Sequence, residues 1–113
     1  MAASAGFAEL LREHLGPLGG LALRRMFGST GLFCHGVMFG LVKHDTLFLR
    51  VDEGNRAAFD EAGTAPFTYR RKGELTALAY RAVPESLLDE PEQLRAWARA
   101  ALAAAHRVAQ ARR

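Results

Sequence analysis

The stretch from Arg24 to Asp52, RRMFGSTGLFCHGVMFGLVKHDTLFLRVD, constrains the fold more than any other part of the chain. Glycine recurs between short apolar runs, at points where a tight turn needs a residue without a side chain. The runs themselves are rich in phenylalanine and valine, which fit a pleated, half-buried surface. This pattern predicts a closely connected antiparallel β-meander. The stretch contains no cluster of catalytic residue types.

One hairpin of this meander allows its strand pairing to be predicted. With Lys43–Thr46 as a four-residue loop, Val42 lies opposite Leu47 and Gly40 lies opposite Leu49. Strict alternation then places one apolar set on each face: Met38, Val42, Leu47, Leu49 and Val51 on the first, and Val37, Phe39, Leu41 and Phe48 on the second. Because both faces are apolar, we expect the second face to be covered too. A helix of the same chain or a second copy in a homodimer would serve.

The remaining sequence predicts helices around the strands. Helices are expected at Ser4–Leu18, at Glu53–Ala62 after a cap at Asp52, and at Pro91–Ala109; strands are expected at Leu23–Phe27, Leu32–Cys34, Val37–Val42, Leu47–Val51, Phe67–Lys72 and Glu74–Val83. Since the strands are joined by hairpins and the helices are grouped between them, the fold class is α+β. We expect one domain over residues 1–113, a two-layer sandwich with an antiparallel sheet in the order α-β(3-4)-α-β(2)-α.

Composition limits the cellular setting and the chemistry. The single cysteine, Cys34, cannot form an internal disulfide or a paired-cysteine zinc site. The first residues mix acidic and basic side chains with apolar ones and lack the pattern of a signal peptide. No run approaches the roughly 18 apolar residues of a membrane span. We therefore expect a cytoplasmic protein with no membrane partner.

The net charge of +3 comes from the last part of the chain. Acids and bases balance over residues 1–89, whereas residues 90–113 carry five arginines and two glutamates. Such a basic helix is typical of contact with an acidic protein surface or with nucleic acid. It is also typical of a solvated helix whose last cations interact favourably with the helix dipole.

Cys34, His35 and His44 are the only hint of a metal site. Neighbouring residues of a strand point to opposite faces, so Cys34 and His35 cannot easily bind the same ion. No nearby base would activate the Cys34 thiol as a nucleophile. We expect no metal, no cofactor and no enzymatic activity.

Two groups of cations are candidate contacts. Arg70, Arg71 and Lys72 belong to the second hairpin, where they would contact a nucleic-acid backbone or discourage pairing between sheet edges. Arg95, Arg99 and Arg107 share one face of the last helix and would contact a protein partner.

The blocks RRMFGSTGLF, GVMFGLV, LFLRVDEGNRAAF, PFTYRRKG and ALAYRAVPESLLDEPEQLRAWARAALAAA, in this order, resemble the TfoX/Sxy N-terminal domain family from about Phe7 to Arg107. The resemblance implies a fold similar to the secretion chaperone-like architecture and a link to natural competence. The motif matches at Arg25, Met26, Phe27, Gly28 and Gly31, then at Val37, Met38 and Phe39, and at Val51 and Asp52. We interpret these residues as turn glycines, core aromatics and a helix cap. Because the chain ends at Arg113, without the C-terminal domain of the full-length regulators, we expect a standalone domain.

The resemblance favours a small regulatory module that contacts a protein of the transcription machinery, such as the cyclic-AMP receptor protein or RNA polymerase. Direct nucleic-acid binding by the basic helix and the Arg70–Lys72 hairpin is the alternative. A small-ligand sensor or an uncharacterised enzyme is a third interpretation. It would require a defined apolar pocket with convergent polar groups between the sheet and the helices.

Overall fold

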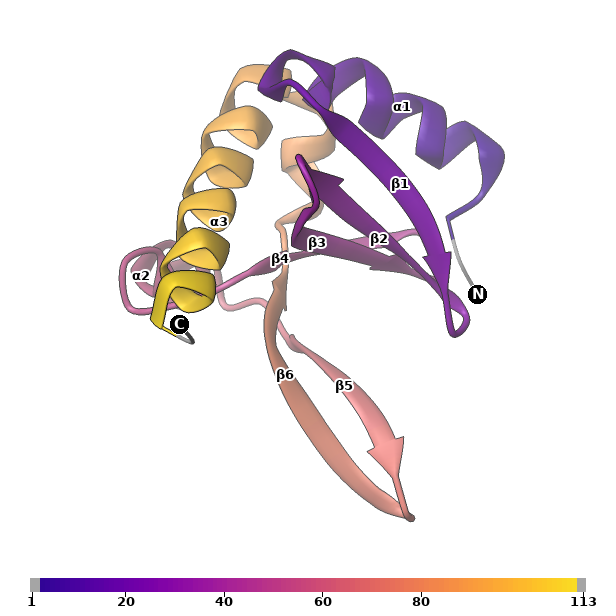
Figure 1. Ribbon diagram of the computed structural model, residues 1–113, viewed down its shortest axis with the longest axis vertical. Coiled ribbons are helices and arrows are strands. Elements are labelled where there is room, and N and C mark those ends of the chain that lie inside the picture. The colour runs from indigo at the N-terminus through magenta and orange to yellow at the C-terminus, as the bar shows by residue number, and fades with distance from the viewer. Residues whose placement is uncertain (1–2, 112–113) are drawn as a thin grey trace.

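The computed structural model describes residues 3–111 and shows helices packed on one face of a six-stranded antiparallel sheet (Figure 1). In chain order the elements are α1 (Ala5–Leu15), the short 3-10 helix η1 (Gly16–Leu18), β1 (Leu21–Met26), β2 (Ser29–Cys34), β3 (Val37–Lys43), β4 (Thr46–Arg50), α2 (Arg56–Ala62), β5 (Pro66–Arg71), β6 (Glu74–Ala82), the 3-10 helix η2 (Glu85–Asp89) and α3 (Pro91–Ala111). The strands lie in the order β1-β2-β3-β4-β6-β5. The predicted α+β class is confirmed.

The main core lies between the sheet and helices α1 and α3. Apolar residues at helical spacing bring Leu11 and Leu15 of α1 and Leu94 of α3 onto the strands, where all three are fully buried. α1 begins at Ser4, whose hydroxyl accepts the Phe7 N–H at 3.3 Å, as its sequence predicts. Small residues of α3, including Ala98, let this helix approach the sheet closely.

Two-residue turns close the four hairpins of the sheet. They are Phe27–Gly28, His35–Gly36, His44–Asp45 and Lys72–Gly73, and every residue in them has a φ angle between +46° and +81°. This geometry matches the right-handed twist of the paired strands. The predicted four-residue loop at Lys43–Thr46 is therefore wrong, because Lys43 and Thr46 pair with each other. The predicted pairings of Val42 with Leu47 and of Gly40 with Leu49 are confirmed.

A β-bulge changes the faces predicted for the start of β3. Leu32 lies opposite Gly40 and Phe33 lies opposite Met38, so that Phe39 is an extra residue between two pairs. Phe39 consequently turns into the helix-covered core and Met38 turns to the opposite face. The predicted faces of Met38, Phe39 and Val37 are wrong, since strict alternation fails at a bulge.

The sheet face opposite α1 and α3 carries its own small cluster, and we call this side the open face. Leu41, Phe67 and Tyr80 are buried there, with Met38 and Phe48 packed against them. Within residues 3–111 no helix contributes to this cluster, so the expected helical cover is wrong. Strands β5 and β6 supply the covering aromatic rings instead. A homodimer through this face stays a prediction.

Helix α2 begins later than predicted. Its first residue is Arg56, not Glu53, and Asp52 is not its cap. The Asp52 carbonyl accepts the N–H of Arg56 at 3.0 Å, and its carboxylate accepts the N–H of Gly54 at 2.8 Å, which makes a turn before the helix. Buried Asn55 braces this corner, since its side chain joins the Asp52 N–H to the Arg50 carbonyl. Gly63 ends the helix in the left-handed conformation, as predicted.

Candidate interaction surface

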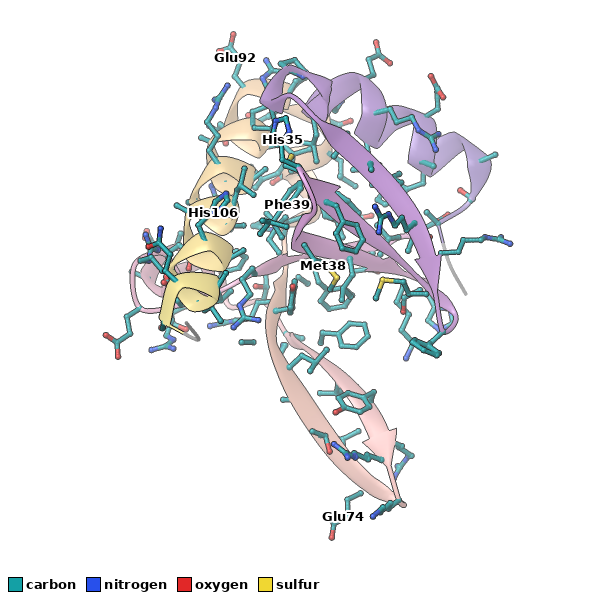
Figure 2. The ribbon with its side chains drawn as sticks, in the orientation of Figure 1. His35, Met38, Phe39, Glu74, Glu92 and His106 are labelled. Carbon is teal, nitrogen blue, oxygen red and sulfur yellow. The ribbon has the colours of Figure 1, made fainter. Side chains whose placement is uncertain are left out.

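Strands β5 and β6 continue beyond the body of the protein as a projecting two-stranded arm (Figure 1). Its tip carries the predicted cations Arg70, Arg71 and Lys72, all exposed, and Glu74 is labelled there in Figure 2. Arg70 donates to the Gly73 carbonyl at 3.3 Å, and within residues 3–111 none of the three cations forms an ion pair. Leu75 lies opposite Arg70 in the hairpin and is 65% exposed. The arm therefore presents positive charge beside unburied apolar surface.

The base of the arm is held firmly by Arg81. Its guanidinium donates to the carbonyls of Thr64 at 2.8 Å and Phe59 at 3.1 Å and pairs with Asp60. These groups lie in the last turn of α2 and in the loop after it, and the Phe59 carbonyl also accepts the N–H of Gly63 at 2.9 Å. Beside this clamp, the rings of Phe48 and Phe67 meet edge to face at 5.1 Å. The arm consequently has an anchored base and a free tip. Arg81 is not among the residues that the sequence pattern predicted as contacts, although a lone arginine in an apolar strand could have indicated it.

The β1–β2 turn is a second projecting tip. Phe27 occupies its first position with a φ of 46° and is fully exposed. The interpretation of the motif phenylalanines as core residues is therefore correct for Phe39 and wrong for Phe27. A bulky residue in the left-handed region is strained, and an exposed ring gains nothing from the hydrophobic effect. Arg24 and Arg25 precede this tip, and both are exposed.

Gly31 makes room for an apolar cluster next to that tip. A Cβ atom at Gly31 would lie 2.9 Å from the Phe33 ring, 3.0 Å from the Met26 sulfur and 3.4 Å from the Met38 sulfur. The three side chains therefore converge over the glycine on the open face. Gly31 and Gly28 differ in their use, since Gly28 serves the turn with a φ of 81°. The interpretation as a turn glycine is therefore confirmed for Gly28 and wrong for Gly31, which lies within β2.

Cations cover the aromatic rings of the open face. The Arg24 guanidinium lies 4.9 Å from the Phe33 ring centroid, and the Lys43 ammonium lies 5.4 Å from that of Phe67. Cation–π contacts of this kind hold positive charge over apolar surface. The open face is thus apolar with positive charge upon it, and a complementary partner would be apolar and acidic.

The predicted arginine face of α3 is only partly available. Arg95 donates to the His14 carbonyl at 2.9 Å and ties α3 to α1. Arg107 donates to both carboxylate oxygens of Asp52, at 2.6 and 2.7 Å. This hydrogen bonding lowers the pKa of Asp52 to about 2 and raises that of Arg107. Arg99 is exposed and stays a candidate contact.

The candidate metal and nucleophile residues, Cys34, His35 and His44, have different surroundings in the structure. Cys34 is buried in the main core, and burial raises the pKa of its thiol. His35 is at an exposed turn and packs on Gly20, where a Cβ atom would come within 2.5 Å of the ring. His44 occupies the tip of the β3–β4 hairpin. In the part of the chain that the structure describes, no three histidine, cysteine or acidic side chains are grouped as metal ligands.

A shallow groove lies between α2 and α3. It has a volume of about 370 Å³, and its walls are mostly alanines together with Phe59 and Trp97. These two rings meet edge to face at 4.8 Å. None of the residues that line the groove has an ionisable side chain.

The fold and these surfaces define a small α+β module whose exposed features are projecting hairpins with cations and unburied apolar side chains. The model of the TfoX N-terminal domain family matches residues 13–105, and the chain belongs to that family. This domain is associated with the regulation of competence. No match to a curated protein was found. Between residues 3 and 111, no helix has both the length and the apolar character needed to cross a membrane.

Proposed function

We propose that this chain is a regulatory binding module that contacts a protein of the transcription machinery through its two projecting hairpin tips. The observation that carries the proposal is the exposure of Phe27 and Leu75, the most exposed large apolar side chains in the described part of the chain. Each lies beside arginines, Arg24 and Arg25 at the first tip and Arg70 and Arg71 at the second. Aromatic and arginine side chains of this kind are typical of interface hot spots.

The partner chemistry follows from the charge of the tips. A partner patch with an apolar pocket and surrounding carboxylates would accept Phe27 or Leu75 and pair with the neighbouring arginines. The association of the family with competence regulation supports a partner such as the cyclic-AMP receptor protein or RNA polymerase. In this proposal Arg99 is an additional contact, and Arg95 and Arg107 stabilise the fold.

Binding of the purified chain to immobilised cyclic-AMP receptor protein and to RNA polymerase would test the proposal. We expect Phe27→Asn and Leu75→Thr each to weaken binding at least tenfold, because an anchor in an apolar pocket contributes roughly 2 kcal/mol or more. Glu92→Gln, an exposed change at the far end of α3, is the matched control and should bind as the wild type does. Equal binding by all variants, or no binding to either partner, would contradict the proposal.

Direct nucleic-acid binding is the second candidate, because Arg70, Arg71 and Lys72 lie together at the tip of a two-stranded ribbon. Such ribbons fit into the major groove of DNA. Three phosphate contacts would give a slope of about −2.7 in a plot of log K against log salt concentration. Binding that is salt-insensitive, or undetectable at about 50 mM salt, would reject this candidate.

A further inference from the structure

A cavity of about 310 Å³ lies where the C-terminal half of α3 meets the β2–β3 turn and strands β4 and β6. Apart from Arg50 and Tyr80, its lining residues are glycine or have apolar side chains. The lining residues are Gly36, Val37, Met38, Arg50, Tyr80, Ala105, Val108 and Ala109. Met38 and the neighbouring stretch of α3, with His106, can be followed in Figure 2. The volume is near the lower end of the range for small-molecule sites.

Arg50 is the one charged residue in this wall, and no carboxylate of the described residues pairs with it. Its Nε atom is buried and has no hydrogen-bond partner. Arg107, two positions from Ala105 on the same helix, already has Asp52 as its partner. A half-buried guanidinium without a carboxylate is costly, so the site favours an anion.

Tyr80 is the second polar group of the cavity. It is almost fully buried, and its ring centroid lies 5.5 Å from the Arg50 guanidinium carbon. Burial raises the pKa of the Tyr80 phenol, and its hydrogen bond with Arg50 only partly opposes this effect. The phenol therefore keeps its proton at neutral pH, and its O–H can donate a hydrogen bond to a bound oxygen.

We propose that this cavity binds a small organic acid, whose carboxylate pairs with Arg50 and accepts a hydrogen bond from Tyr80, and whose hydrocarbon part packs on Met38 and Val108. A planar guanidinium matches a carboxylate in geometry. A phosphate dianion would need further donors, and the rest of the wall consists of apolar side chains and a glycine.

The position of the cavity connects such a ligand to the arm. Tyr80 lies in β6, which runs on from the cavity to the arm tip, and Ala105 and Val108 lie on α3. A bound acid would contact both elements at once and stabilise their packing. This inference concerns a site separate from the hairpin tips, so binding of the acid can be tested independently of the proposed macromolecular partner.

A titration followed by NMR of methyl groups would test the inference. Hexanoate is the probe, hexanol is its neutral counterpart, and inorganic phosphate is the competing anion. We expect hexanoate to shift the methyl signals of Met38, Ala105 and Val108 saturably, and to leave that of Ala57, on the distant α2 groove, in place. Hexanol and phosphate should each bind at least about tenfold more weakly, as expected for the loss of a charge-assisted hydrogen bond or of apolar contact.

Two variants separate binding from folding. Arg50→Gln should keep or raise the melting temperature without ligand, since it removes a half-buried charge that has no carboxylate partner among the described residues, and should lower the affinity for hexanoate at least tenfold. Arg56→Gln, an exposed arginine at the start of α2, should respond as the wild type does. No saturable shift with hexanoate, equal binding of hexanol, tighter binding of phosphate, or an unchanged response in Arg50→Gln would overturn the inference.

Discussion

The β3–β4 and β5–β6 hairpins share one turn geometry, but the tip of the first is held by another part of the chain and the tip of the second is free. Both close with two residues in the left-handed region, His44–Asp45 and Lys72–Gly73. The β3–β4 hairpin lies in the centre of the sheet, and its tip is tied down because the Ser4 N–H donates to the Asp45 carboxylate at 2.8 Å. The β5–β6 hairpin has a free tip with exposed leucines. The local sequence therefore specifies that a hairpin forms. The elements that pack around the hairpin decide whether it stabilises the fold or remains available for binding.

We expect the largest difference in the free energy of unfolding between a substitution in the main core and one in the arm. Phe39→Ala should lower the free energy of unfolding by about 3–5 kcal/mol, because it empties a fully buried position in the main core. Leu75→Ala should change it by no more than about 0.5 kcal/mol, as an exposed site predicts. Chemical denaturation measures both. A destabilisation by Leu75→Ala close to that of Phe39→Ala would break the comparison.

The clamp at the arm base should give the next largest effect. Arg81→Ala should lower the free energy of unfolding by about 2 kcal/mol, because it leaves the Thr64 carbonyl and the Asp60 carboxylate without the Arg81 donor. In the Arg81→Ala variant, hydrogen exchange should accelerate more for the amides of the arm than for those of β3, relative to the wild type. Arg81→Lys should restore little, since an ammonium cannot reproduce the guanidinium fork. If exchange accelerated equally for amides over the whole sheet, Arg81 would stabilise the entire fold and not the base of the arm in particular.

At the other tip we expect a gain in stability. Phe27→Asn should raise the free energy of unfolding by about 0.5–1 kcal/mol, because asparagine tolerates the left-handed conformation better than phenylalanine does. Thermal denaturation measures this change, and Phe33→Leu, a change within a strand, should not raise stability. A destabilising Phe27→Asn would show that the ring supports the fold after all.

The smallest effect concerns the ion pair between Asp52 and Arg107. The pKa of Asp52 falls from its ordinary 3.8 to about 2, so the carboxylate stabilises the folded state fully only above about pH 4. This stabilisation is lost as the pH falls from 3.8 towards 2. Asp52→Asn should therefore melt slightly below the wild type at neutral pH, and the difference should vanish near pH 2. A difference that persists at that pH would assign the role of Asp52 to its turn rather than to the ion pair.

Pattern alone predicted much of the fold. Alternating apolar residues and glycine positions predicted six strands in the correct order along the chain, and the β3–β4 pairing was predicted residue by residue. Helical spacing predicted α1 and α3. These features are local, because a strand, a turn or an amphipathic helix is specified by neighbours in the sequence. The exposed cations of the arm tip were predicted for the same reason.

The faces of β3 and the candidate sites depended on distant contacts. The bulge at Phe39 arises from pairing with β2, and no periodicity in β3 alone reveals it. Arg81 and Arg50 are both arginines in strands, yet one has three partners from α2 and its following loop and the other faces a cavity.

The sequence by itself therefore determined the strands and the helices α1 and α3, since these follow from short-range backbone preference and apolar spacing, and its motif blocks indicated the family. Only the tertiary structure decided that Phe27 is exposed while Phe39 is buried, and that Arg107 has a counterion while Arg50 has none among residues 3–111. The physical reason is that burial and charge pairing are properties of side chains brought together from far apart in the chain.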